Sequence, residues 1–224
     1  MELNEYEIRE QLCEIGRRIY NRNMVVANDG NFSVRLSDNE FICTPTGVSK
    51  GFMTPESMCI IDAKGNVLEA SEGFKPSSEM KMHMRVYEKR KDINAVVHAH
   101  PIFCTTFAAV GMPLNQPIIA EAVVQFGEVP VVEFGMPSTE ELPNNLEKYL
   151  ESYDAVLLES HGALTWGTDL ISAYMKMESL EFYAELTYRT KMLGGAKEFD
   201  EEQVKRLYEL RKTYGLKGRH PGDK

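Results

Sequence analysis

Apolar residues recur at helical spacing at the start of the chain and then gather in short runs separated by turn residues. Ile8, Leu12, Ile15 and Ile19 lie three or four positions apart. Side chains at this spacing share one helical face, so an amphipathic helix is predicted over residues 4–22. The short runs that follow predict two strand pairs. FSVRL is expected to pair with EFICT, and MCIID with NVLEA across a Lys-Gly turn.

Helical and strand patterns alternate along the rest of the chain. The predicted strands are INAVVHAH, VPVVEF and YDAVLLES. Ser77 or Ser78 is the expected N-cap of the first helix in this part, and Ser138 with Glu141 forms a capping-box pattern at the second. A Gly-Gly pair predicts the end of the third helix. The four helices are predicted over residues 79–90, 138–151, 169–192 and 200–213.

These elements predict an α/β domain in which helices cover a mixed sheet. A purely parallel sheet is not expected, because several successive strands are joined by segments too short for the crossovers that parallel pairing requires. A length of 224 residues fits one domain. We expect residues 1–215 to form this domain and residues 216–224 to be a mobile C-terminal tail.

Composition and charge argue against several classes of protein. The net charge of −9 does not suit a nucleic-acid-binding protein, which needs a basic face. A small phosphorylated substrate remains compatible, because a few local donors can hold one phosphate. No apolar run reaches the length of roughly 18 residues that a membrane helix needs, and the charged, amphipathic start of the chain is unlike a signal peptide. The four cysteines are far apart, which indicates reduced thiols in a cytoplasmic protein.

Two histidines at the end of the strand AVVHAHP are the first candidates for chemistry. Since side chains alternate along a strand, His98 and His100 point to the same face and are close enough to bind one metal ion. They fit equally well as ordinary polar residues where the strand ends. His161 occupies a similar place after YDAVLLES, and Gly162 permits close backbone approach beside it. Three histidines would leave one position on zinc for water or substrate.

A carboxylate and two hydroxyls cluster at the start of the helix predicted over residues 79–90. Glu79 and His83 lie four positions apart on one helical face. A surface Glu–His pair is the ordinary interpretation. Ser77 and Ser78 precede them, however, and hydroxyls beside the unpaired N–H groups of a helix start form an anion site. Glu79 is therefore a candidate metal ligand or base.

Two loops earlier in the chain have the composition of ligand-binding turns. Asn31 and Thr46 offer side-chain donors, and Gly47 permits a tight turn over a small anion. Each loop alone is ordinary turn chemistry, but together they predict a phosphate pocket. The nearby basic residues Arg35 and Lys50 fit this pocket and solvated surface positions equally well.

Five motifs follow one another in the order of a known family: DGNFSVR, TPTG, PSSE-x3-H, VVHAH and LLESHG. Together they resemble the class II aldolase/adducin superfamily, and within it the zinc-dependent sugar-phosphate aldolases of the L-fuculose-phosphate type. The superfamily also contains sugar-phosphate dehydratases, 4-epimerases and non-catalytic adducin-like interaction proteins. The resemblance extends from the opening helix to KTYGL. It implies a single three-layer α/β/α domain with a mixed, largely antiparallel central sheet, and a homotetramer with sites between subunits.

The resemblance also implies a site. It implies zinc, or another divalent transition metal, bound by His98, His100 and His161, with Glu79 as a fourth ligand that can leave the metal and act as base. The substrate would be a ketose 1-phosphate of the fuculose, rhamnulose or ribulose type, cleaved to dihydroxyacetone phosphate and an aldehyde through an enediolate. The residues implied at its phosphate are Asn31, Thr46, Gly47, Ser77 and Ser78.

The proton donor for the aldehyde oxygen is where the branches of the superfamily differ. The aldolases of this type use a tyrosine from a neighbouring subunit, but here Ile119 stands in its place. Tyr214 matches a second tyrosine near the end of these aldolases. Glu121 lies close to a glutamate that serves as acid and base in the dehydratases, although a surface glutamate is the ordinary interpretation. An aldolase is expected because the PSSE glutamate is present; a dehydratase, a 4-epimerase and an adducin-like interaction protein are the alternatives.

Overall fold

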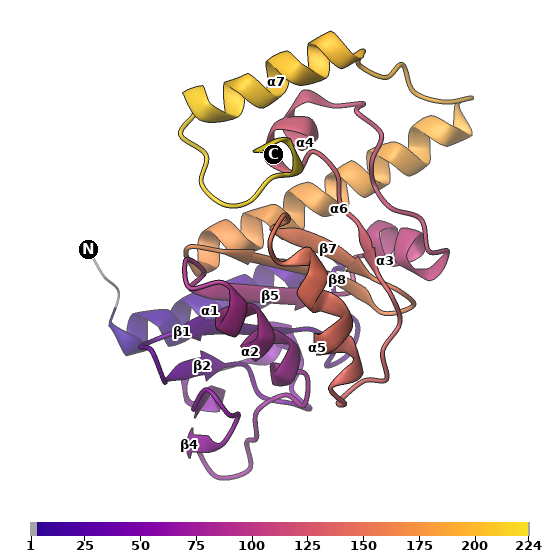
Figure 1. Cartoon of the computed structure of the whole chain (residues 1–224). Coiled ribbons are helices and arrows are strands. Elements are labelled where there is room, and N and C mark those ends of the chain that lie inside the picture. Colours follow the sequence, from indigo (N-terminus) through magenta and orange to yellow (C-terminus); the bar gives the residue numbers. More distant parts are fainter. Residues whose placement is uncertain (1–3, 224) are drawn as a thin grey trace.

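A mixed sheet of eight strands forms the centre of the protein, of which the computed structural model describes residues 4–223 (Figure 1). The strand order is β4-β3-β2-β1-β5-β8-β7-β6, and every neighbouring pair is antiparallel except β6 and β7. The strands are β1 (Asn31–Arg35), β2 (Phe41–Cys43), β3 (Cys59–Ile61), β4 (Val67–Glu69), β5 (Ala95–Ala99), β6 (Val131–Val132), β7 (Ala155–Leu158) and β8 (Gly162–Gly167). The predicted mixed, largely antiparallel sheet is confirmed.

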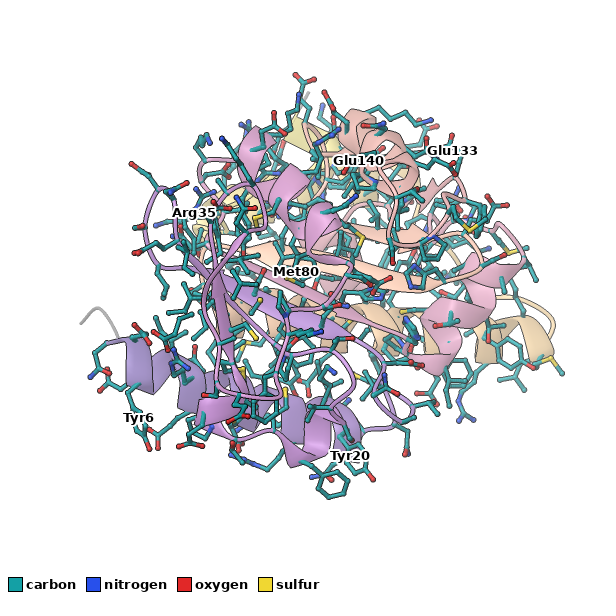
Figure 2. All side chains as sticks on the ribbon, turned by 90° about the horizontal axis from the view of Figure 1, so that it is seen from below. Tyr6, Tyr20, Arg35, Met80, Glu133 and Glu140 are labelled. Atoms are coloured by element: carbon teal, nitrogen blue, oxygen red, sulfur yellow. The ribbon has the colours of Figure 1, made fainter. Side chains whose placement is uncertain are left out.

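Helices cover both faces of this sheet, which gives the expected three layers. The helices are α1 (Glu5–Asn21), α2 (Met80–Lys89), α3 (Ile102–Ala109), α4 (Ala120–Gln125), α5 (Glu141–Leu146), α6 (Leu170–Met192) and α7 (Glu201–Thr213). Four short 3-10 helices complete the set: η1 (Lys50–Phe52), η2 (Pro55–Ser57), η3 (Glu147–Tyr149) and η4 (Pro221–Asp223). In Figure 2, Tyr6 and Tyr20 of α1 lie on one side of the sheet and Glu140, at the start of α5, lies on the other.

Alternating side chains of the central strands divide the core into two clusters. Val97 of β5 packs in the cluster that contains α1, α3 and α6, and its neighbour Val96 packs in the cluster that contains α2 and α5. Trp166 of β8 is fully buried in the second cluster. Neighbouring residues of a strand point to opposite faces, and a core cluster covers each face, so the central strands are apolar on both faces.

Most of the long elements lie where the sequence predicts them. The helix expected over residues 138–151 is shorter than predicted and consists of α5 followed directly by η3. Ser138 has a φ of 65° and donates its hydroxyl to Ser78 Oγ, so it does not cap a helix. The N-cap of α2 is Glu79 rather than Ser77 or Ser78. Strand β8 and helices α3 and α4 were not predicted.

The C-terminal segment lies beside α4 (Figure 1). His220 is buried and its Nε2 lies 2.9 Å from Val123 O. Arg211 donates to Val124 O and to Gly218 O, so it joins α4 to the same segment. The mobility of residues 216–224 stays a prediction. In the part of the chain that is described, no helix is both long enough and apolar enough to cross a membrane.

Candidate metal centre

Three histidines from two adjacent strands meet at one end of the sheet. His98 is on β5, His100 follows it, and His161 lies in the turn between β7 and β8. Because β5 and β8 run antiparallel, with Ala99 paired to Ala163, the end of β5 lies beside the start of β8. Ring nitrogens of the three histidines all lie within 4.8 Å of one another.

The backbone at this meeting point requires glycine. A Cβ on Gly162 would lie 2.6 Å from Ala99 O and 2.7 Å from His100 Cδ2, so a larger residue would push β8 away from the histidines. Gly30, which precedes β1, has a φ of 78° and a similarly close approach to His98 O. Both glycines allow the strands to bring their polar ends together.

Glu79 completes the cluster from the N-terminus of α2. Its Oε1 lies 3.0 Å from His161 Nε2, and its Oε2 lies 3.3 Å from His98 Nε2. Asn31 Nδ2 donates to the same Oε2 at 2.7 Å. Asn31 is paired with His98 in the register of β1 and β5, which explains why its side chain reaches the cluster.

In His98 and His100, the polar contact of Nδ1 fixes the direction in which Nε2 points. His98 Nδ1 lies 2.9 Å from Ala163 O, and a carbonyl only accepts, so Nδ1 carries the proton. His100 Nδ1 faces Asp29 Oδ2 at 3.3 Å in the same way. Anchoring of this kind by carbonyl and carboxylate oxygens is typical of metal-binding histidines.

The Nε2 atoms of His98 and His100 and the carboxylate of Glu79 form an electron-rich set that suits a cation. With Nδ1 protonated on both rings, the Nε2 lone pairs of His98 and His100 face each other at 3.0 Å. The carboxylate of Glu79 lies beside them. Lone pairs at this distance repel unless a proton or a cation lies between them, so the donor set fits a metal ion. Three imidazoles and one carboxylate are ligands that zinc accepts.

Burial prepares these groups for metal binding. It lowers the pKa of the His98 imidazole well below 6.5, and it lowers the pKa of His100, to which His161 also contributes. The rings are therefore neutral at neutral pH, as metal ligands must be. Burial by itself raises the pKa of Glu79, but its interactions with His98, with His161 and with the Asn31 amide outweigh burial and lower the pKa.

His83 lies on α2 one turn after Glu79 but is not part of a surface pair. Its ring is fully buried, with Nδ1 2.7 Å from Ser33 Oγ, and Ser33 Oγ lies 2.9 Å from Tyr87 OH. The interpretation of Glu79 and His83 as a surface pair is therefore wrong.

The three loops predicted to bind phosphate lie close together. Thr46 N donates to Lys75 O at 2.8 Å, and Pro45 forms a β-bridge with Pro76, so the Thr46–Gly47 turn lies beside the segment of Ser77 and Ser78. Asn31 joins the cluster through Glu79. Its Oδ1 is buried without a hydrogen-bond partner among the described residues.

The two basic residues near these loops differ in position. Arg35 is at the opposite end of β1 from Asn31, where its guanidinium lies over the Tyr87 ring. Lys50 is 1% exposed, so it does not occupy a solvated surface position. Sequence reasoning also missed Asp29, although its carboxylate orients His100.

Glu121 and Tyr214 lie apart from the histidines. Both line a cavity of about 660 Å³ between α4, α6 and α7, and the described residues that line it include neither the three histidines nor Glu79. Tyr214 is 64% exposed. Within one chain, the structure does not bring these two candidates to the cluster.

Comparisons with known proteins agree with this geometry. Residues 10–188 match the family described as Class II Aldolase and Adducin N-terminal domain. An L-fuculose phosphate aldolase of Methanococcus maripaludis is 38% identical over 80% of this chain and 94% of its own length. A 3-oxo-tetronate 4-phosphate decarboxylase of Haemophilus influenzae is 33% identical over 80% and 86% of the two lengths. A 5-deoxy-D-ribulose 1-phosphate aldolase of Bacillus thuringiensis is 30% identical over 92% and 96%.

Solved structures show the same likeness. An L-fuculose 1-phosphate aldolase superposes with a TM-score of 0.84 at 28% identity, covering 92% of this chain and 96% of that one. An L-fuculose-1-phosphate aldolase from Thermus thermophilus gives a TM-score of 0.73 at 29% identity, covering 85% and 97%.

Proposed function

The chain belongs to the class II aldolase and adducin family, and on this premise we propose that it is a metal-dependent lyase that cleaves a ketose 1-phosphate. The products would be dihydroxyacetone phosphate and an aldehyde. The observation that carries the proposal is the convergence of three histidines and Glu79 on one point. The relatives that are named as aldolases of fuculose phosphate and of 5-deoxyribulose 1-phosphate support a sugar of this class.

In this proposal His98, His100, His161 and Glu79 bind zinc, although cobalt, manganese or iron would accept the same donors. A bound ion would act as a Lewis acid and would stabilise the negative charge that cleavage leaves beside the carbonyl.

Glu79 acts as the base in the condensation direction. It would accept a proton from the carbon beside the carbonyl of dihydroxyacetone phosphate, which gives the enediolate. Contacts with His98 and His161 lower the pKa of Glu79, whereas burial raises it. When substrate separates the carboxylate from these imidazoles, burial remains and the carboxylate becomes a stronger base. Asn31 Nδ2 donates a hydrogen bond to Glu79 Oε2 and orients the carboxylate.

The three loops beside the cluster bind the substrate phosphate in this proposal. Binding at that point would hold the reacting carbon in place relative to Glu79. The adjacency of the Thr46–Gly47 turn and the 75–78 segment supports this role. The proposed phosphate-binding residues are Asn31, Thr46, Gly47, Ser77 and Ser78.

Glu121 and Tyr214 are proposed to act on the site of a neighbouring subunit in a homotetramer, as donors to the aldehyde oxygen. Their separation from the histidines of their own chain supports an intersubunit role. Exposed apolar side chains along α6 support an interface, since such surfaces mark protein contacts: Ile171, Met175 and Phe182. The four cysteines are free and buried, which supports location in the reducing cytoplasm.

A decarboxylase is the second candidate. The relative named 3-oxo-tetronate 4-phosphate decarboxylase favours it. Loss of carbon dioxide from a 3-oxo acid also leaves negative charge beside a carbonyl, so the same cluster would serve. A dehydratase, a 4-epimerase and an adducin-like interaction protein stay alternatives without such an observation.

A substrate panel distinguishes these candidates. The zinc-loaded protein would be assayed with fuculose, rhamnulose, ribulose and 5-deoxyribulose 1-phosphates for release of dihydroxyacetone phosphate, and with 3-oxo-tetronate 4-phosphate for release of carbon dioxide. We expect cleavage of at least one ketose phosphate, and its loss with a chelator. His98→Ala and His161→Ala should lose bound metal and activity, whereas the control His220→Ala, at a buried histidine beside α4, should retain bound metal. Unchanged metal content in both cluster variants would contradict the site, and carbon dioxide release alone would select the decarboxylase.

A further inference from the structure

Lys50 is a buried cation whose amino group has only neutral partners. Its Nζ donates to Asn28 O at 2.9 Å and to Val48 O at 2.8 Å. Among residues 4–223 it forms no ion pair, and Asp29 is the one charged group that acts on it from nearby. Burial of an ammonium group without a hydrogen-bonded counter-ion costs stability.

The two partners of Lys50 belong to different loops of the proposed phosphate pocket. Val48 follows the Thr46–Gly47 turn, and Asn28 precedes the Gly30 turn that leads into Asn31. Gly30 and Gly47 have φ values of 78° and 74°, a region that favours glycine. The amino group of Lys50 therefore joins two turns that approach the cluster from different strands.

Packing of the Lys50 segment does not require a charge. The backbone at Lys50 is fixed by α1, since a Cβ on Gly16 would lie 2.4 Å from Lys50 O. The aliphatic part of the side chain fills the interior, as the side chain of methionine would. What methionine lacks is the positive charge and the two hydrogen bonds.

A positive charge near the pocket would strengthen its binding of phosphate. The proposed phosphate-binding groups are an amide, three hydroxyls and a glycine, all of them neutral. A phosphate ester carries two negative charges near neutral pH, and a cation in a buried, low-dielectric setting attracts it more strongly than an exposed one. Lys75 also lies at these loops, but its side chain is exposed, and it accepts the hydrogen bond from Thr46 N through its backbone carbonyl.

We propose that Lys50 is the residue that makes the site specific for phosphorylated substrates: its amino group holds the two turns in register and its charge balances the phosphate dianion. This inference rests on the proposed function. Lys50 is a positioning residue, because it acts on the substrate through the turns that it joins. Burial lowers the pKa of Lys50 to about 8, against the opposing charge of Asp29, so the ammonium form persists at neutral pH.

The decisive comparison is between Lys50→Met, Lys50→Arg and the control Lys205→Met, at an exposed position of α7. We expect Lys50→Met to raise KM for the ketose phosphate, and the dissociation constant for inorganic phosphate, by about tenfold to a hundredfold. kcat for the phosphorylated ketose and kcat/KM for the same ketose without its phosphate should change much less. Zinc content should stay the same. Lys50→Arg should recover part of the affinity, and Lys205→Met should behave as wild type.

A second measurement needs no folded Met variant. Above pH 7.5 the phosphate group is already a dianion, so its binding to the wild-type protein should weaken as the pH rises through about 8 and Lys50 loses its charge. Lys50→Arg, which stays charged, should remove most of this decline. An equal decline in both proteins would overturn the inference.

Two other outcomes would also overturn it: phosphate binding by Lys50→Met as tight as that of wild type, or equal losses for phosphorylated and unphosphorylated ketose. The latter indicates a purely structural role. Failure of the proposed function is separate, because it appears as a wild-type protein that binds phosphate but cleaves no ketose phosphate. Inorganic phosphate binding still tests Lys50 in that case.

Discussion

His83 and His98 show how the surroundings of a residue decide its role. Both rings are fully buried. His98 Nε2 faces His100 Nε2 and the carboxylate of Glu79, whereas His83 Nδ1 lies 2.7 Å from Ser33 Oγ, beside Tyr87. Burial lowers the pKa of His83 to about 3, with Glu79 acting in the opposite direction. In an unfolded chain the same imidazole would titrate near 6.5.

The difference predicts acid sensitivity at His83. Between pH 6.5 and pH 3 the unfolded chain binds a proton at this residue that the folded chain does not, so the free energy of unfolding falls as the pH falls. The loss approaches a limit of about 5 kcal/mol at the acid end. Denaturant unfolding of wild type and His83→Gln across this range measures it. We expect a shallower decline in the variant, and equal slopes would contradict the prediction.

At the scale of single residues, the sequence identifies which side chains are candidates for a site but not how deeply each is buried. The spacing of His98 and His100 is sufficient to put both on one face, because strand alternation is local. The burial of Lys50 depends on Asn28, which precedes it by 22 positions and belongs to another loop. No local pattern carries that information, and the same is true of the contact between Asp29 and His100.

Among the elements, α4 depends most on residues from elsewhere in the chain. It has six residues, and short helices are marginal without external contacts. Carbonyls near its end are bonded by the C-terminal part of the protein: Val123 O lies beside His220 Nε2, and Val124 O accepts from Arg211. Figure 1 shows α7 and the C-terminal segment beside this helix.

Arg211→Met is therefore predicted to loosen α4. Loss of the guanidinium leaves buried carbonyls without a partner, which costs about 1–3 kcal/mol. Amide hydrogen exchange should accelerate in residues 120–126 and in residues 216–223, which Arg211 also contacts, but not in β5. Arg206→Met is the matched control, because Arg206 lies at an exposed position of α7, the helix that also contains Arg211. Exchange in α4 that is unchanged by Arg211→Met would show that the helix is stable by itself.

The elements that the sequence predicts well are those with enough turns or alternations to show a period. α1 and α6 are long and end at the predicted places to within a residue or two. α3 and α4 have eight and six residues, too few to establish a helical period. β8 begins directly after His161 with a glycine, so it reads as a loop, yet its pairing with β5 and β7 brings His161 to His98.

In the whole molecule, the two parts of the proposed chemistry lie in different places on one chain. The histidines and Glu79 gather at the ends of β5 and β8, while Glu121 and Tyr214 line the cavity beside α7. Sequence motifs predict both sets but not their separation, because motif order says nothing about which subunit a residue serves. If sites lie between subunits, each site is built from a histidine part of one chain and a tyrosine part of another.

This arrangement predicts complementation between two impaired variants. His98→Ala should lose metal, and Tyr214→Phe should slow turnover with little effect on metal content. In mixed oligomers each site draws its two parts from separate chains, so about one site in four would combine native parts of both. Co-expressed, differently tagged subunits should then be more active than either parent oligomer. Mixing His98→Ala with Glu79→Gln is the control, because both changes affect the same part, so every subunit carries an altered histidine part and no site is intact. The activity of each mixed oligomer is compared with the average activity of its two parent oligomers. Activities are expressed per subunit that carries all three native histidines. A site contained within one chain would give no rescue above that average with Tyr214→Phe, and the proposed intersubunit role of Tyr214 would then be contradicted.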